Sequence, residues 1–383
     1  MWLITDLRPR KRGSFEDGLL ALARRLRAEG RACTVVVSQP PPAWWATPFV
    51  DAGADVRALD FRRPLLAAVT LAGWLRVARP AVCHFHFVAP VSPVVAAARA
   101  SQPPGAAIVA HHHVTLTPRR LRGPLAIVRR VRGLVADRLV DRHVAVSRVV
   151  ADSVRAAYAI PEARLAVGEN AIDVGRFRRA PSRAEARARV GLPAEARLIA
   201  CVSRLADEKG PQIAVQAMAR VVEACPEALL LLVGEGPARA RLEALADELR
   251  VTRAVRFLGV RDDVDVVLAA SDVALVPSVW DEAFGLAAVE AMAAGRPVVV
   301  TRAGALPEVV GDAGVVVPRS EPAAMADALT RLLADPLSAA RLGRAAAKRA
   351  AAVYGLPRWV GELVALYERL APVVGGAPRE AAS

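Results

Sequence analysis

Short apolar segments alternate with helical patterns along nearly the whole chain, and this alternation limits the fold more than any other feature. The short segments are rich in Val, Ile and Leu and are typical of buried strands, whereas the longer segments between them have the period of helices. Repeats of strand, helix and strand build parallel sheets. We expect strands at Trp2–Thr5, Thr34–Val37, Val56–Leu59, Val82–Phe85, Ile108–Ala110, His143–Val146, Leu165–Val167, Leu198–Val202, Ala228–Val233, Ala254–Phe257, Val273–Val276, Val298–Val300 and Val315–Val317.

The pattern is interrupted over residues 170–195, where Arg, Pro and Ala dominate. A chain of 383 residues is expected to form two or three domains. We therefore predict an α/β protein with two doubly wound, Rossmann-like domains and an interdomain cleft, because ligands of such sheets bind beyond the carboxyl ends of the strands. The expected divisions are 1–175, 176–357, and a C-terminal segment 358–383 whose helix packs back across the domain junction before a flexible tail.

The N-terminal half is strongly basic and the C-terminal half is nearly neutral. Residues 1–180 contain 28 Lys or Arg against 13 Asp or Glu, whereas residues 181–383 contain 24 against 25. This asymmetry favours an acidic partner, such as a phosphorylated or lipid-linked acceptor or an anionic membrane surface. General arginine enrichment of the chain would produce the same excess. Aromatic residues make up 4% of the sequence, too few for the stacking platforms of single-strand binders, so no nucleic-acid partner is expected.

The cysteines and the apolar runs indicate the cellular compartment. Cysteines without metal-binding spacing lie in or beside apolar segments, and we expect them to be reduced core residues of a cytoplasmic protein. They are Cys33, Cys83, Cys201 and Cys225. No uncharged run approaches the ~18–20 residues of a membrane span, and charges close to the N-terminus argue against a signal peptide. Peripheral association with the inner face of the membrane is compatible with the basic N-terminal half.

The segment from Glu282 to Glu290 has the most specific pattern in the chain. It joins the predicted strand Val273–Val276 to an Ala-rich helix that begins near Gly285. Glu282 is therefore in a loop, and Glu290 is about a turn and a half into the helix. The helix-start N–H groups between them can bind an anion. A sugar nucleotide fits this arrangement, because it has hydroxyl groups on both sides of a diphosphate.

Two cations, Arg204 and Lys209, follow the first strand of the second half and suit a diphosphate. Glycine-containing turns follow the next two strands, at 233–237 and 257–260. Together with the later segment, these motifs resemble the retaining, GT-B fold glycosyltransferases of family 4, the "group 1" glycosyl transferases. The resemblance is most specific over residues 195–320. Its motifs occur in the order Ser-Arg-Leu-x3-Lys-Gly, Val-Gly-Glu-Gly-Pro, Phe-Leu-Gly and Pro-Ser-x3-Glu-x-Phe-Gly-Leu-x3-Glu.

The resemblance implies a retaining, metal-independent hexosyltransferase. It would move a sugar from a UDP- or GDP-sugar, as co-substrate without any cofactor, to an acceptor hydroxyl of a glycolipid, a cell-surface polysaccharide or a specialised metabolite. Front-face displacement is expected, because the first-half motifs contain no obvious nucleophilic carboxylate. The implied donor contacts are Arg204, Lys209, Gly13, Phe284, Gly285 and Leu286 for the diphosphate, Glu290, Gly234 and Val260 for the ribose and nucleotide, and Glu282 as the catalytic contact with the sugar.

The histidines all lie in the first half of the chain. In the family, a histidine just after the strand at 108–110 faces the donor sugar and the acceptor, and His113 fits this catalytic place best. His111 and His112 are its rivals and are otherwise assigned, with His86, to the acceptor side. No cysteine or carboxylate joins these histidines at metal-ligand spacing, so no metal site is predicted.

A second interpretation belongs to a different class of function. A non-catalytic protein of the same fold would act at a membrane or on a partner through its basic N-terminal half, and it would be expected to lose the charged donor residues, which are all present. Two basic segments stand out in this half: the arginine-rich run 8–12, which could bind an acidic acceptor, and the stretch Leu121–Leu134, which could contact an anionic membrane as a basic amphipathic helix. The latter is equally typical of an ordinary helix of the acceptor domain.

Overall fold

The computed structural model describes residues 1–10, 13–116 and 124–371. It divides into two compact units: unit 1 comprises Met1–Glu169 and Pro357–Ser383, and unit 2 comprises Asn170–Leu356. The sequence predicts this division a few residues later, after residue 175. The expected tail over 372–383 and parts of both basic segments, 11–12 and 117–123, lie outside the described residues.

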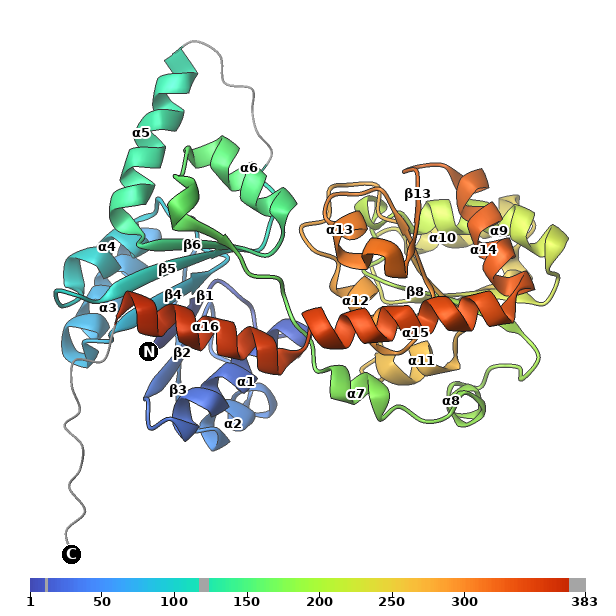
Figure 1. Ribbon diagram of the computed structural model, residues 1–383, viewed down its shortest axis with the longest axis horizontal. Helices are drawn as coiled ribbons and strands as arrows, with labels where there is room; N and C mark the ends of the chain where they lie inside the picture. The colour runs from blue at the N-terminus through green and yellow to red at the C-terminus, as the bar shows by residue number, and fades with distance from the viewer. Residues whose placement is uncertain (11–12, 117–123, 372–383) are drawn as a thin grey trace, which may run out of the picture. The chain divides into compact units, whose positions relative to one another are not determined.

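Unit 1 contains a parallel sheet with the strand order β3-β2-β1-β4-β5-β6-β7 (Figure 1). Its strands are β1 Trp2–Thr5, β2 Cys33–Val37, β3 Ala54–Ala58, β4 Val82–His86, β5 Ala107–His112, β6 Arg142–Ala145 and β7 Leu165–Val167. Its helices are α1 Ser14–Ala28, α2 Ala43–Asp51, α3 Pro64–Ala78, α4 Pro93–Ser101, α5 Pro124–Leu139, α6 Arg148–Tyr158 and the C-terminal α16 Leu356–Leu370.

Unit 2 contains a second parallel sheet, with the order β10-β9-β8-β11-β12-β13. Its strands are β8 Arg197–Val202, β9 Ala228–Val233, β10 Val255–Gly259, β11 Val273–Val276, β12 Val298–Thr301 and β13 Val315–Val317. Its helices are α7 Val174–Arg178, α8 Arg183–Val190, α9 Pro211–Ala224, α10 Arg239–Glu248, α11 Val264–Ala270, α12 Leu286–Ala293, α13 Leu306–Val310, α14 Pro322–Ala334 and α15 Pro336–Val353. Two Rossmann-like domains with parallel sheets confirm the predicted fold class.

The core of unit 2 explains why its strands are continuous apolar runs. Every residue of β9 is buried. Leu230 and Leu232 belong to the core on one face of the sheet, while Leu229 and Leu231 belong to the core on the other face. A parallel sheet covered by helices on both faces buries successive side chains in opposite directions, so neither position tolerates a polar residue.

The amphipathic helix α16 packs on unit 1, although it follows the whole of unit 2 in the sequence (Figure 1). Trp359, Leu363 and Tyr367 on its apolar face are buried. The hydroxyl oxygen of Tyr367 lies 2.6 Å from Nδ1 of His84 on β4. This contact ties the end of the described chain to the central strands of the first sheet.

The four cysteines are buried and free, as the sequence predicts for core residues. None of the described helices is both long enough and apolar enough to cross a membrane.

Candidate functional site

Lys209 and Glu282 form the central contact of the candidate donor site in unit 2. Lys209 ends the short 3-10 turn Asp207–Lys209 that follows β8, and its Nζ donates to Oε1 of Glu282 at 2.7 Å. Ser278 Oγ donates to the same carboxylate oxygen at 2.5 Å. Glu282 is only 8% exposed. A carboxylate this buried needs such partners, because an unpaired buried charge is costly.

Glycines let three loops approach one another around this pair. Gly210 has φ +70, and a Cβ there would lie 2.0 Å from the carbonyl oxygen of Pro277. Gly304 has φ +55, and a Cβ there would lie 2.2 Å from the carbonyl oxygen of Glu282. The backbone of Glu282 is also fixed directly, since its carbonyl accepts from the N–H of Ala305 at 2.8 Å. The side chain of Glu282 is therefore presented from a backbone that has little freedom.

The other predicted donor residues of this segment surround the start of α12. Gly285 is the N-cap of that helix with φ +100, in the left-handed region that favours glycine. Leu286 is the first residue of the helix, and Glu290 is half-buried further along it. Phe284 is buried, and its ring packs edge-on against Tyr354 with centroids 5.5 Å apart. The ring of Phe284 therefore packs in the core, and its predicted contact with the diphosphate stays a prediction about its backbone N–H.

Arg204 lies in the same loop as Lys209 and has a different environment. Its guanidinium pairs with Glu208 one turn later, and its side chain is 62% exposed. An exposed pair of this kind contributes little stability and is easily exchanged for a stronger anionic partner. Gly234 follows β9 with φ +134, and Val260 after β10 is 73% exposed.

In unit 1, histidines from β4 and β5 stack on one face of the sheet. Nδ1 of His86 lies 3.0 Å from Nε2 of His113, and the rings of His111 and His113 stack with centroids 4.4 Å apart. Phe15 at the start of α1 contacts His113 edge-on at 5.1 Å. Gly13, the N-cap of that helix, donates its N–H to Glu16 at 3.0 Å. The predicted histidines and the N-terminal glycine loop therefore belong to neighbouring elements.

His112 lies apart from this group. Successive side chains of a strand point to opposite faces, and Nε2 of His112 is 3.0 Å from Nδ1 of the buried His143. Burial lowers the pKa of His112 to about 4 and is also the main cause that lowers the pKa of His143 to about 3. Of the two rivals of His113, His111 is thus the one on the same face.

The stacked histidines His84, His86 and His111 are buried, and burial favours their neutral form. Burial is the main cause that lowers the pKa values of His84 and His86 well below their ordinary range, and that of His111 to about 3. Ring nitrogens of these three residues lie within 4.8 Å of one another. Neutral imidazoles at such a spacing can bind a transition-metal ion. The absence of a metal site therefore stays a prediction, which chelation tests below.

Three contacts of the site escaped the sequence-based reasoning. Ser278 has no predicted role beyond its place in the Pro-Ser-x3-Glu motif, yet it donates a hydrogen bond to Glu282 directly. Thr301 Oγ1 donates to the carbonyl of Ser278 at 2.5 Å and so supports it from β12. Phe15 contacts the histidine group from α1. Only Ser278 had a local signal, because it stands four residues before Glu282 in a strand-to-helix loop.

Two models of known protein families together match most of the chain. The model of the "Glycosyltransferase Family 4" domain matches residues 16–176, and that of "Glycosyl transferases group 1" matches residues 182–349. The chain belongs to the family 4, group 1 glycosyltransferases. This confirms the family resemblance of the motifs.

Several relatives of this family 4 chain are similar over part of their length. A D-inositol 3-phosphate glycosyltransferase of Corynebacterium urealyticum is 38% identical over 244 residues, which are 60% of this chain and 57% of that protein. A protein of the same name from Saccharomonospora viridis is 40% identical over 225 residues, which are 55% of this chain and 51% of that protein. The matches thus span little more than half the length of these relatives.

Solved structures of low sequence identity share the fold. HepE of Anabaena in complex with UDP has a TM-score of 0.80 at 20% identity, covering 96% of this chain and 99% of HepE. A glycosyltransferase of Rickettsia africae has a TM-score of 0.79 at 17% identity, covering 97% of this chain and 99% of that protein. These likenesses establish the GT-B fold for the family 4 chain.

Proposed function

We propose that this protein is a retaining glycosyltransferase that moves a sugar from a nucleoside-diphosphate sugar to a hydroxyl group of a phosphorylated acceptor. The observation that carries the proposal is the contact of Lys209 with the buried Glu282 beside the N-terminus of α12. One carboxylate there can accept from sugar hydroxyls while the cations and helix N–H groups meet the leaving diphosphate. Such cations would perform the charge neutralisation that a metal ion performs elsewhere.

The comparisons support the proposal from two sides. The relatives above are named for D-inositol 3-phosphate, a phosphorylated acceptor, which agrees with the basic N-terminal half of this chain. HepE has been crystallised with UDP and with UDP-glucose, which favours a UDP-sugar as the donor to test first. We assign His113 to the donor and acceptor side of the reaction, with His86 and His111 next to it.

A donor screen tests this proposal. Thermal unfolding is measured with UDP-, GDP-, ADP- and dTDP-sugars, with and without EDTA. We expect stabilisation by one nucleotide family that is insensitive to EDTA. Arg204→Ala should weaken donor binding roughly tenfold, since a charge-assisted hydrogen bond to phosphate is lost. Product analysis by NMR with inositol 3-phosphate and with inositol should give the donor's anomeric configuration and a preference for the phosphorylated acceptor.

Arg220→Ala is the matched control, because Arg220 on α9 is also an exposed arginine with a carboxylate partner, Asp327. Its donor affinity should equal that of the wild-type protein. Failure of every donor to bind would refute the proposal. Equal losses in Arg204→Ala and Arg220→Ala would remove Arg204 from the site. Loss of binding with EDTA would refute metal independence.

A second proposal concerns the membrane and rests on α5. Side chains one turn apart on this helix expose apolar surface, with Ile127 67% and Val131 and Leu134 each 52% exposed. Arg130 and Arg132 are exposed beside them. Apolar side chains flanked by arginine are typical of helices that lie on anionic bilayers. We propose that α5 contacts the membrane surface, which would also serve a non-catalytic protein of this fold.

Vesicle sedimentation tests the role of α5. We expect binding to phosphatidylglycerol vesicles and not to phosphatidylcholine vesicles, reduced several-fold by Val131→Glu, because burying one new charge opposes insertion. Leu337→Glu is the control, since Leu337 is 83% exposed on α15 of unit 2. Equal binding of both variants, or no preference for the anionic lipid, would contradict the proposal.

A further inference from the structure

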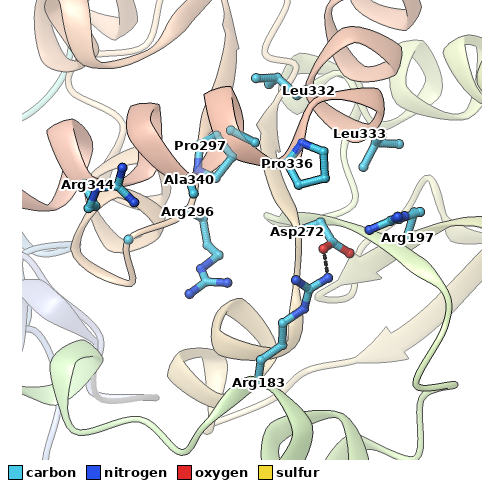
Figure 2. Close-up of a pocket in the computed structure, with 12 residues that line it drawn as sticks. Arg183, Arg197, Asp272, Arg296, Pro297, Leu332, Leu333, Pro336, Ala340 and Arg344 are labelled. Atoms are coloured by element: carbon cyan, nitrogen blue, oxygen red, sulfur yellow. Dashed lines mark ion pairs between the residues drawn. The ribbon is translucent and has the colours of Figure 1, made fainter.

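A cavity of about 260 Å³ lies in unit 2 at the amino ends of its central strands (Figure 2). Arg197 is the first residue of β8, Asp272 precedes β11 and Pro297 precedes β12. The candidate donor loops follow the carboxyl ends of β8 and β11. The amino and carboxyl ends of parallel strands lie on opposite sides of the sheet, so the cavity is separate from the candidate donor site.

Arginines from separate segments of unit 2 line this cavity. They are Arg183 on α8, Arg197 on β8, Arg296 after α12 and Arg344 on α15. Asp272 is the acidic residue among the lining residues that the structure describes. Figure 2 shows Arg183 and Arg197 close to Asp272, with Arg296 and Arg344 to the other side of the view. The lining therefore has a large excess of positive charge.

The carboxylate of Asp272 already has several hydrogen-bond and ion-pair partners in the protein. Asp272 pairs with Arg183, and its Oδ2 accepts from Arg187 at 2.9 Å and from the N–H of Leu198 at 2.7 Å. Arg344 has no ion-pair partner within the described ranges and is exposed. The nearest carboxylate of Arg197 is Glu227, at the long distance of 3.9 Å. The cavity thus contains cations that no protein anion neutralises.

Arg296 is held in place by neutral groups. Its Nε donates to the carbonyl of Ala294 at 3.0 Å, and its Nη1 donates to that of Ser271 at 2.9 Å. Burial lowers the pKa of Arg296, and the charge of Arg183 lowers it further. The pKa of Arg183 is lowered by burial and then by the charge of Arg197. These arginines repel one another, and a bound anion would relieve that repulsion.

We propose that this cavity binds the phosphate or diphosphate group of a small molecule, as a second anion site distinct from the candidate donor site. Guanidinium groups bind phosphate oxygens through paired, charge-assisted hydrogen bonds. The volume lies just below the roughly 300–1,000 Å³ of drug-sized ligand pockets, which suits a phosphorylated metabolite. Leu332, Leu333 and Pro336 supply an apolar wall for the remainder of such a molecule.

Calorimetric titration with inorganic pyrophosphate tests the site. The full chain is used in an Arg204→Ala background, so that anion binding by the candidate donor loop is already weakened. We expect one bound pyrophosphate per chain, with affinity reduced roughly tenfold by adding Arg344→Ala, because one charge-assisted contact is lost. Arg344 is exposed and unpaired in the described structure, so this change should leave the melting temperature unchanged.

Arg341→Ala is the matched control, since Arg341 is an exposed arginine of the same helix that does not line the cavity. It should leave the affinity at the level of the Arg204→Ala protein. Absence of pyrophosphate binding in that background would overturn the proposal. Equal losses from Arg344→Ala and Arg341→Ala would also overturn it, because they would indicate diffuse attraction to a basic surface. Titration with adenosine monophosphate and with inositol phosphate then distinguishes nucleotide from sugar-like sources of the phosphate.

Discussion

Replacing Lys209 with methionine is expected to reduce kcat/KM for sugar transfer about 10²–10³-fold, the usual loss when one fixed donor to a developing anion is removed. Lys209 Nζ lies 2.7 Å from Oε1 of Glu282, in the loop that leads into α12, where we propose that the leaving diphosphate gains charge. Methionine keeps an unbranched, apolar side chain only one atom shorter than that of lysine, but it has no charge. The measurement is initial-rate kinetics with the donor identified by the screen.

Lys348→Met is the control for this substitution. Lys348 is an exposed lysine on α15, so its replacement has the same chemistry outside the candidate site. Its kcat/KM should match that of the wild-type protein. A Lys209→Met enzyme with unchanged kcat/KM would contradict the proposed role of Lys209.

A double variant separates catalysis from stability. Lys209→Met leaves the carboxylate of Glu282 buried with one neutral donor, Ser278, and should lower the free energy of unfolding by about 1–3 kcal/mol. Adding Glu282→Gln removes the unpaired charge and should restore stability without restoring turnover. Recovery of turnover together with stability would mean that the pair serves the fold alone.

The fold could be predicted because its strands are buried on both faces. Runs such as Ala228–Val233 have no polar residue, and their observed bounds are the predicted ones. The predicted bounds are less accurate where polar and apolar residues are mixed. The sequence predicts β10 at Ala254–Phe257, and the strand is found at Val255–Gly259. There, the pairing with β9 is irregular between Phe257 and Gly259, which an apolar pattern does not encode.

The sites depend on contacts between distant segments, and these could not be predicted from local patterns. Lys209 and Glu282 were each singled out from their motifs, but their direct contact arises from the way β8 and β11 pair in the sheet. The arginine-lined cavity could not be predicted, because each of its cations comes from a different helix, strand or loop that is distant in the sequence. Sequence spacing identifies candidate residues, whereas their partners follow from the topology.

Unit 1 is expected to lose stability steeply as the pH falls from about 6.5 towards 4, while unit 2 changes little. Every histidine of the chain is in unit 1. The pKa values of His111 and His143 are lowered to about 3 and that of His112 to about 4, with burial as the main cause. Below pH 6.5 the unfolded chain therefore binds protons that the folded unit excludes.

The size of this effect follows from proton linkage. Each such histidine removes about 1.4 kcal/mol of unfolding free energy per pH unit between its unfolded and folded pKa values, so three together remove about 4 kcal/mol per unit. A domain stable by about 5–15 kcal/mol should unfold within this window. Below the folded pKa values both states are protonated, and the slope disappears.

Urea unfolding at pH 7.5, 6.5, 5.5 and 5.0, in the presence of EDTA, measures the slope in each unit separately. Trp280 is the tryptophan of unit 2, whereas the other tryptophans lie in unit 1, so intrinsic fluorescence reports mainly on unit 1. Trp280→Phe removes the remaining signal of unit 2, and circular dichroism then follows both units. His112→Asn should reduce the slope of unfolding free energy against pH, because it removes one of the two buried imidazoles of the His112–His143 pair. Equal stability of unit 1 at pH 7.5 and 5.0, or a parallel loss in the histidine-free unit 2, would show that buried neutral histidines do not govern acid sensitivity.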